Sequence, residues 1–376
     1  MWPWTKSPPP EAKASATGPL VALTRPAQPV WTPRDYAGFA REGYQKNPVV
    51  LRCVRMIAEA AASIPLRAGG HPAEALLDRP NPEQTGTELL ESFFGHLQVA
   101  GNAYLELAEL GGAPRELYAL RPDRMRVIPG PEGWPEAWDY TVAGRSHRYS
   151  RDAASGLSPI LHLKLFNPVD DHYGHAPLEA AASAVDIHNA GGAWNKALID
   201  NAARPSGALV FTGRDGVDRL TEDQFARLKA ELESAHAGPA AAGRPLLLEG
   251  GLEWKPMSLT PADMDFLNAR HAAAREIALA FGVPPMLLGI PGDNTYANYR
   301  EANLAFWRQT IVPLARKMAA ALSGWLGPRY GEPLRLTLDL DAAPALQGER
   351  DALWARLEAA TFLDTDEKRA LAGIAP

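Results

Sequence analysis

Two long helical stretches flank a short module of strands in the second half of the chain, and this arrangement limits the possible folds more than any other feature. The first stretch, at 178–201, is rich in alanine. The second, at 261–281, has Thr260 as its cap, Pro261 as its first helical residue and Gly282 as the residue that ends it. The sequence therefore predicts a small α/β module inserted between two helices.

The module itself has the predicted order strand, helix, strand, strand. Short apolar runs predict strands at 208–211, 245–248 and 252–256. A capping box at Thr221-Glu222-Asp223-Gln224 opens a helix that runs to about Ser234. In the preceding helix, Gly191-Gly192 is a weak point that allows a bend or close packing.

The first half of the chain has the pattern of an α+β fold. Apolar residues recur at helical spacing from Asn47-Pro48 until Pro65 ends the helix, and a second helix is predicted at 87–99 with Thr87 as its cap. Short, turn-bounded apolar runs then predict strands of an antiparallel sheet at 103–107, 116–120 and 125–128.

The C-terminal third contains one more long helix, predicted at 300–326 and interrupted at Pro313. Leucine alternates with polar residues at 334–340, which predicts a half-buried strand. A terminal helix from 352 carries Leu353, Leu357 and Ala360 on one face.

Composition excludes several classes of protein. A chain of 376 residues with 46% hydrophobic and 22% charged residues has the balance of a globular protein with two or three folding units. The 38 Lys and Arg against 44 Asp and Glu give a net charge of −6, so a generic basic attraction to DNA or anionic lipid is not expected. The single cysteine, Cys53, excludes an intrachain disulfide and predicts a buried thiol in a reducing compartment.

Export and membrane insertion are not expected from this sequence. Residues 1–30 are rich in proline, alanine and serine, which predicts an extended or disordered arm. This segment has no apolar core of a signal peptide, and no window reaches the ~18 apolar residues of a membrane span.

The common catalytic signatures are absent from the sequence. It contains no P-loop, dinucleotide fingerprint, His-Glu-x-x-His motif or nucleophile elbow. The nearest approach to a metal cluster is Asp170, Asp171, His172 and His175, which share a face only if the segment is helical. Gly174 and Pro177 favour a solvated turn there, so we expect no metal and no cofactor.

Two further polar features have both a structural and a functional interpretation. Asp339 and Asp341 form either a carboxylate pair or, as the leucines beside them favour, the solvent face of a strand. The stretch 291–300 is rich in Asn, Tyr and Arg, side chains that stack on bases and bind phosphates. Taken alone, this composition favours an ordinary polar loop.

An ordered string of motifs, covering nearly all of the chain from about Trp31, resembles the portal proteins of long-tailed, siphovirus-type phages. The motifs are Asn47-Pro48-Val49-Val50-Leu51-Arg52-Cys53-Val54, Ala62-Ser63-Ile64-Pro65-Leu66, Arg79-Pro80-Asn81-Pro82, Gly101-Asn102-Ala103-Tyr104, Leu120-Arg121-Pro122-Asp123, Asn201-Ala202-Ala203-Arg204-Pro205-Ser206-Gly207, Ile277-Ala278 and Phe281-Gly282-Val283-Pro284-Pro285-Met286-Leu287-Leu288-Gly289. The short, alanine-rich chain is most similar to the compact portals of bacterial gene transfer agents.

The resemblance implies a non-enzymatic ring, usually of twelve subunits, at one vertex of a capsid. Its implied partners are the major capsid protein, the large terminase and a head–tail adaptor, and double-stranded DNA passes through its channel without sequence specificity. It implies assembly in the bacterial cytoplasm, followed by residence at the portal vertex of a phage or phage-like particle. The alternatives are a metal-dependent hydrolase that uses the cluster from Asp170 to His175, and a monomeric protein-binding adaptor.

The resemblance also divides the chain into the parts of a portal. They are a flexible arm at 1–30, an α+β wing at 31–177, a first stem helix at 178–203, a clip at 204–258, a second stem helix at 259–282, a tunnel-loop region at 283–299, a long helix and wing strand at 300–341, and a short crown at 342–376.

Carried over to single residues, the resemblance gives three groups of site residues. The tunnel loop that lines the DNA channel contains Asp293, Asn294, Thr295, Tyr296, Asn298, Tyr299 and Arg300. The clip offers Arg204, Arg214, Arg244 and Lys255 for docking of partners. The second stem helix contributes Leu267, Arg270 and Ile277 to contacts between subunits.

The second stem helix has an apolar stripe that we expect to pack against the other stem helix or a neighbouring subunit. The stripe consists of Met264, Leu267, Ala274, Ile277, Ala278 and Phe281. Asp265, Arg270 and Glu276 lie largely off this stripe, where they are free to form ion pairs between subunits or to face the channel.

Overall fold

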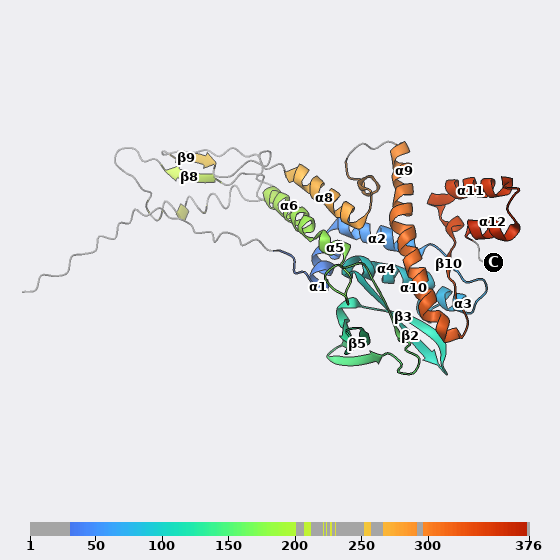
Figure 1. The fold of residues 1–376 in the computed structure, drawn as a ribbon. Helices are drawn as coiled ribbons and strands as arrows, with labels where there is room; N and C mark the ends of the chain where they lie inside the picture. The colour runs from blue at the N-terminus through green and yellow to red at the C-terminus, as the bar shows by residue number, and fades with distance from the viewer. Residues whose placement is uncertain are drawn as a thin grey trace, which may run out of the picture. The chain divides into compact units, whose positions relative to one another are not determined.

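The computed structural model describes most of the chain, and residues Thr32–Pro376 form one compact unit (Figure 1). The described residues are 31–200, 207–211, 252–256, 266–291 and 296–373, with single positions between 221 and 230. The predicted arm at 1–30 and the predicted strand at 245–248 lie outside them.

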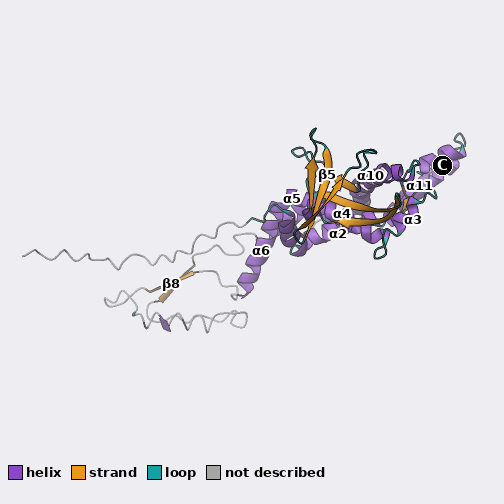
Figure 2. Cartoon of the chain, turned by 90° about the horizontal axis from the view of Figure 1, so that it is seen from below, coloured by secondary structure: helices purple, strands orange, loops and turns teal. Residues whose placement is uncertain are grey.

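Two three-stranded antiparallel sheets form most of the described β structure, and two pairs of strands, β1–β10 and β8–β9, form the rest (Figure 2). The first has the order β3–β2–β7, with bounds Ala113–Leu120, Asn102–Leu110 and Ile160–Lys164. The second has the order β4–β5–β6, with bounds Met125–Pro129, Pro135–Val142 and Arg145–Ser150. The three predicted strands are present, and each is longer than the apolar run that indicated it. The prediction of one sheet was wrong for β4, because β2 and β3 pair with each other while β4 pairs with β5 in the second sheet.

Helices α2 (Pro48–Ala62) and α4 (Gly86–Ala100) pack on each other, and α4 also packs on β2. Ile57, Phe93 and Leu97 have no solvent exposure in this core. Burying each such side chain contributes about 1.5–3 kcal/mol relative to leaving it exposed. Shorter elements complete this half: α1 (Tyr36–Gly38), a π-helical segment (Phe39–Gln45), β1 (Leu66–Arg67), α3 (Ala73–Asp78) and a 3₁₀ turn (Pro122–Arg124).

The N-terminal cap of α4 differs from the prediction. Thr85, not Thr87, caps the helix: its Oγ1 accepts the Glu88 N–H at 3.3 Å, and the Glu88 carboxylate accepts the Thr85 N–H at 2.7 Å. This reciprocal pair is a capping box, which satisfies two helix-end donors at once. At the other end, Gly101 adopts φ 70°, a left-handed conformation that favours glycine.

The two long helices around the inserted module are α5–α6 (Pro177–Ala180 and Ala182–Asp200) and α8 (Phe266–Phe281). The first predicted helix is therefore interrupted at Ala181, and α6 packs along α8. Of the module, the structure describes β8 (Gly207–Phe211) and β9 (Leu252–Pro256), which confirm the strands predicted at 208–211 and 252–256 and pair with each other in antiparallel fashion.

The long C-terminal helix begins earlier than predicted and does not break at proline. It consists of α9 (Tyr296–Phe306), a π-helical segment (Trp307–Ile311) and α10 (Val312–Tyr330). Pro313 has no N–H and its ring clashes with the carbonyl four residues before it in a regular α-helix. The wider π-helical turns precede Pro313, and the helix continues through it (Figure 1).

The predicted strand at 334–340 is only two residues long. β10 (Thr337–Leu338) pairs with β1, and Leu334 and Leu336 are instead buried. The chain then forms 3₁₀ turns at Leu340–Ala342 and Pro344–Leu346, followed by α11 (Gln347–Ala359) and α12 (Thr365–Ala372).

The two carboxylates predicted to share a strand face have separate ion-pair partners. Asp339 lies 3.2 Å from Arg67 Nη2, and Asp341 accepts from Arg350 Nη2 at 3.0 Å. Asp341 lies in the 3₁₀ turn beyond the strand, so the two side chains do not form a carboxylate pair on one strand face.

Candidate functional site

The contact between α6 and α8 is built around a glycine pair. A Cβ atom at Gly191 would lie 2.9 Å from Arg270 Cγ, so only glycine lets the arginine cross α6 at this distance. The close packing predicted for Gly191-Gly192 is therefore confirmed. Arg270 is half-buried in this contact, and its Nε is buried without a hydrogen bond in the described part of the chain.

The predicted faces of α8 need two corrections. Arg270 was expected off the packing stripe, but it lies between α6 and α8 because the glycine pair leaves room for its aliphatic stem. Leu267 was expected on the buried stripe, but 64% of it is exposed within the subunit. Ile277 is fully buried inside the subunit, so its contacts are intrachain.

A buried polar network fixes the start of α6 to α2, and sequence reasoning missed it. Asn47 caps α2 by accepting the N–H groups of Val49 and Val50 at 3.0 and 3.2 Å. Its Nδ2 donates to Asn189 Oδ1 at 3.0 Å and lies 3.2 Å from His188 Nδ1. Burial, with a smaller effect of Arg270, lowers the pKa of His188. The motif Asn47-Pro48 signalled the helix cap but not its long-range partners.

The segment between α8 and α9 is compact where the structure describes it. Gly282 ends α8 with φ +66°, and a 3₁₀ turn at Pro285–Leu288 leads to Gly289 with φ +70°. The Arg275 guanidinium donates to the Pro291 carbonyl. These contacts fix the chain on one side of the predicted tunnel loop.

The predicted tunnel residues fall partly on a helix. Asp293, Asn294 and Thr295 lie outside the described residues. Tyr296 is the first residue of α9, and Asn298, Tyr299 and Arg300 follow it on the exposed first turns of that helix. Half of Tyr299 is exposed, and Arg300 Nη2 lies 3.9 Å from Glu301. The prediction of a loop up to residue 299 was therefore wrong by four residues.

The predicted clip residues are mostly outside the described part. This holds for Arg204, Arg214 and Arg244. Lys255 lies on β9, opposite Ala208 of β8.

The segment from Asp170 to His175 is a loop, as Gly174 and Pro177 indicated. Asp170 Oδ1 accepts the N–H groups of His172 and Tyr173 at 2.7 and 3.0 Å, which closes a turn. His175 Nδ1 instead lies 3.2 Å from Glu179. Within the described ranges, no three His, Cys, Asp or Glu side chains come together in a way that would hold a metal ion.

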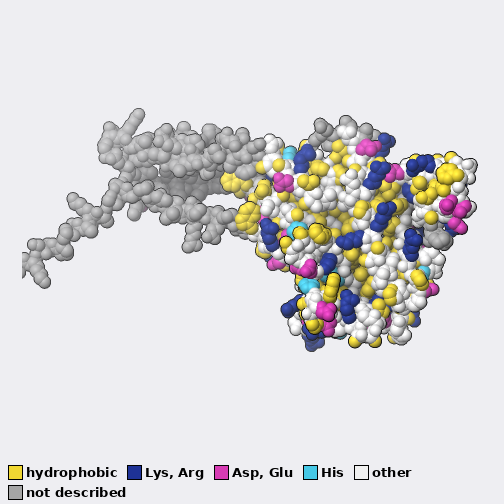
Figure 3. Space-filling model, in the orientation of Figure 1, with side chains coloured by type: hydrophobic (Ala, Val, Ile, Leu, Met, Phe, Trp, Pro, Cys, Tyr) yellow, Lys and Arg dark blue, Asp and Glu magenta, His cyan; other side chains and the backbone are white. Residues whose placement is uncertain are grey.

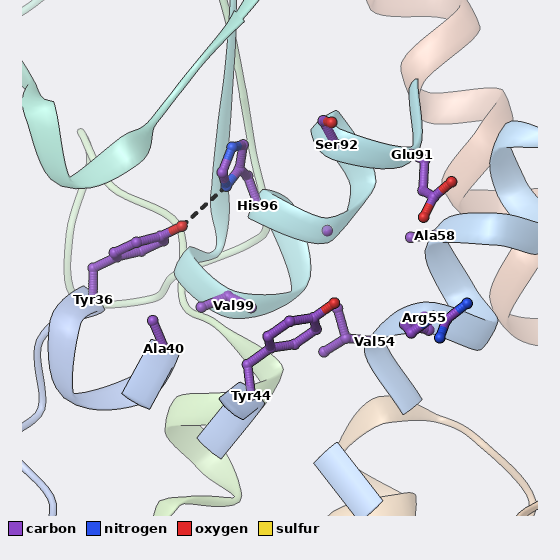
Figure 4. A pocket seen from close by; sticks show the side chains of 11 residues that line it. Tyr36, Ala40, Tyr44, Val54, Arg55, Ala58, Glu91, Ser92, His96 and Val99 are labelled. Carbon is purple, nitrogen blue, oxygen red and sulfur yellow. Dashed lines mark hydrogen bonds between the residues drawn. The ribbon is translucent and has the colours of Figure 1, made fainter. Parts of the chain in front are cut away.

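A small pocket of about 290 Å³ lies between the π-helical segment, α2 and α4 (Figure 4). Val54, Ala58 and Val99 give it an apolar wall. Tyr36 Oη lies 3.1 Å from His96 Nδ1 at one side. Burial, followed by the charge of Arg121, lowers the pKa of His96 to about 4, so the imidazole is neutral at neutral pH.

Comparison with known proteins identifies this fold. The family model described as "Phage portal protein" matches residues 48–373. The chain belongs to the phage portal protein family.

Three known proteins are similar to this chain over most of its length. A chain in the neck of a native gene transfer agent particle with C12 symmetry is 53% identical, with a TM-score of 0.70 over 93% of this chain and 96% of that one. A chain in the neck of an empty particle with C6 symmetry is 52% identical, with a TM-score of 0.71 over 93% and 96%. The probable portal protein of Streptomyces phage phiC31 is 25% identical over 87% of this chain and 74% of that protein.

The motifs that carried the portal resemblance lie at fixed points of the fold. Asn47 caps α2 and Pro48 is its first residue, and Gly101 can approach the Gly174 backbone closely because it has no Cβ. Gly282 ends α8, and Ile277 is fully buried. The resemblance is therefore confirmed, including its likeness to gene transfer agents. No described helix of this portal protein has the length and apolar character that crossing a bilayer requires.

Proposed function

We propose that this portal protein forms a ring of twelve subunits at one vertex of a phage-like particle. The observation that carries the proposal is the 53% identity, over 93% of the chain, with a chain in a neck of C12 symmetry. The ring is the channel through which DNA enters during packaging and leaves afterwards. It resides in the particle neck after assembly in the cytoplasm.

The parts of the subunit divide this task. Helices α6 and α8 form the stem, 204–258 the clip, and 289–299 with the first turn of α9 the tunnel region. The sheets before Pro177, together with α10 and β10, form the wing, and 342–376 form the crown. The described strand pair β8–β9 lies in sequence between the two long helices, which supports the assignment of the clip.

The proposed partners follow from this position. The clip contacts the large terminase during packaging and a head–tail adaptor afterwards, and the wing contacts the major capsid protein. The subunit catalyses no reaction. Its net charge of −6 supports a passive role towards DNA, because a lumen with many Lys and Arg contacts would bind phosphates and resist translocation.

Measurement of mass and shape tests the ring. Light scattering of the purified chain should give a particle about twelve times the subunit mass of 40.6 kDa. Negative-stain images should show a ring with a central hole. A particle of that mass without a hole, or a chain that remains monomeric at all concentrations, contradicts the proposal.

A further inference from the structure

Several arginine side chains line a hollow beside α10. One part, of about 600 Å³, is lined by Arg316, Arg335 and Arg350 and by no acidic side chain. A second part, of about 650 Å³, shares Arg316 and Arg350 and adds Arg308, Arg356 and one glutamate. We call this hollow between α10, β10, α11 and α12 the arginine groove. Its size is within the range of about 300–1,000 Å³ that is typical of ligand sites.

Three of the five arginines of the groove, Arg316, Arg335 and Arg356, make no ion pair with the residues that the structure describes. Arg350 is paired with Asp341, and Arg308 with Glu349. Arg316 and Arg335 are exposed, and neither makes an ion pair with any residue that the structure describes. The chain as a whole has a net charge of −6, so this local excess of positive charge is opposite in sign to the charge of the chain. An occupant of the groove should therefore be acidic.

The walls between the arginines are apolar. Leu336, Leu338 and Leu340 line the part beside β10, and Leu346 and Leu353 line the part beside α11. A good occupant consequently combines acidic groups with an apolar side chain, because each then contacts a matching surface.

The loop between α11 and α12 has this composition. Phe362 is 85% exposed at its tip, and Glu358, Asp364, Asp366 and Glu367 surround it in sequence. Figure 3 shows acidic side chains gathered at the outer end of this hairpin, with Lys and Arg side chains nearer to α10. The capping box of Asp364 and Glu367 orders the loop, since each side chain accepts the other residue's N–H, at 2.7 and 3.0 Å.

We propose that the acidic tip, residues 358–367, of one subunit inserts into the arginine groove of the next subunit in the ring. The tip cannot insert into the groove of its own subunit, because α11 and α12 form a hairpin whose connecting loop points away from α10 (Figure 1). A projection and a complementary hollow at different places on one chain form a head-to-tail contact, the type that closes into rings. Burial of an aromatic ring such as Phe362 removes about 150–250 Å² from water at each contact. This contact rests on the proposed ring.

Charge reversal on both sides tests the contact. The groove variant is Arg316→Glu with Arg335→Glu, and the tip variant is Glu358→Arg with Asp366→Arg. Each alone places like charges in the contact, so its light-scattering mass should fall from that of the ring towards the 40.6 kDa monomer. Mixed in equal amounts, the two variants should form rings again, because each tip then meets a groove of opposite charge.

A matched control separates this contact from the effect of net charge. Arg115→Glu with Arg145→Glu changes the charge equally on exposed strands of the two sheets, and rings should persist. Far-ultraviolet circular dichroism should be the same for all variants.

The opposing outcomes are distinct. If wild-type rings form and both charge variants also form rings, the tip–groove contact is wrong while the ring stands. If the mixture fails to form rings, the tip–groove contact is wrong. The contact is also wrong if the groove variant keeps its ring but retains less DNA than the wild type, because the groove then binds another anionic partner. A wild-type chain that stays monomeric contradicts both proposals.

Discussion

A single glycine sets a close approach of two backbone segments on which the fold depends. Gly101 ends α4 in a left-handed conformation, and a Cβ there would lie 2.5 Å from the Gly174 carbonyl oxygen. Asn102 secures the same contact, since its Oδ1 accepts the Gly174 N–H at 2.9 Å. Gly331 ends α10 with nearly the same φ but has no atom within 4 Å of such a Cβ.

Replacement of these two glycines separates conformational strain from steric clash. Gly331→Ala should lower the free energy of unfolding by about 1–2 kcal/mol, the cost of left-handed backbone for a residue with a Cβ. Gly101→Ala should lower it by clearly more, because a backbone carbonyl cannot move aside as a flexible side chain can. Urea unfolding of both variants measures the difference, and equal losses would contradict the structural reason given for Gly101.

His96, a half-buried and neutral histidine, should make the subunit sensitive to acid. The pKa of His96 is lowered to about 4, by burial first and by Arg121 second, from an unfolded value near 6.5. Because the folded pKa is the lower one, unfolding takes up a proton below about pH 6.5. The stability that depends on neutral His96 is therefore present above pH 6.5 and decreases as the pH falls towards 4.

His96→Asn should reduce this acid sensitivity, because the amide does not titrate and retains an acceptor for Tyr36. The free energy of unfolding, measured between pH 7 and pH 4, should fall less steeply in this variant than in the wild type. Tyr36→Phe is the control, since it removes the hydroxyl but keeps the imidazole and so should retain the pH dependence. If the free energy of unfolding of His96→Asn falls with pH as steeply as that of the wild type, His96 does not contribute to the acid sensitivity.

At the scale of helices and strands, local patterns predicted more than long-range contacts. Gly282 after an apolar stripe was sufficient to predict the end of α8, and short, turn-bounded apolar runs were sufficient to predict β2, β3 and β4. The contact of the first half of α6 with α2 depends on Asn47 and Asn189, which are 142 residues apart, and no local pattern contains that pairing. The strand at 334–340 failed because Leu334 and Leu336 pack as core residues, while β1 offers a partner to only two residues.

Ile277 and Leu267, two apolar residues of α8, should differ in their effects on the stability of the subunit. Ile277 is fully buried in the subunit, so Ile277→Ala should lower the free energy of unfolding by about 2–5 kcal/mol. Leu267 is 64% exposed, so Leu267→Ala should change subunit stability by no more than about 0.5 kcal/mol. If Leu267 contacts a neighbouring subunit, its variant should nevertheless dissociate rings at low concentration.

Unfolding and light scattering of the same two samples check this division. Arg270→Ala serves as a third variant, because the arginine lies within the α6–α8 contact. Its loss should lower the free energy of unfolding of the subunit more than it weakens the assembly of the ring. A stable Ile277→Ala variant, or a Leu267→Ala variant that unfolds more easily, would mean that the two faces of α8 are reversed.

At the scale of the whole ring, charge on the channel wall should control the passage of DNA. In the proposed ring, Tyr299 at the start of α9 faces the duplex, and half of its surface is exposed in the single subunit. Tyr299→Lys would add one positive charge per subunit, and so a circle of twelve around the DNA. For each phosphate that such a circle contacts, a plot of log affinity against log salt concentration becomes steeper by about −0.9.

Packaging of DNA by rings of this variant should therefore be slow at low salt and recover as salt is raised. Tyr299→Gln removes the same aromatic ring without adding charge, and its packaging rate should not acquire this salt dependence. The rate of nuclease-protected DNA accumulation, measured with purified terminase over a series of salt concentrations, gives the comparison. Identical salt profiles for the Lys and Gln variants would place Tyr299 away from the DNA, since a ring of cations within reach of the phosphates cannot leave that profile unchanged.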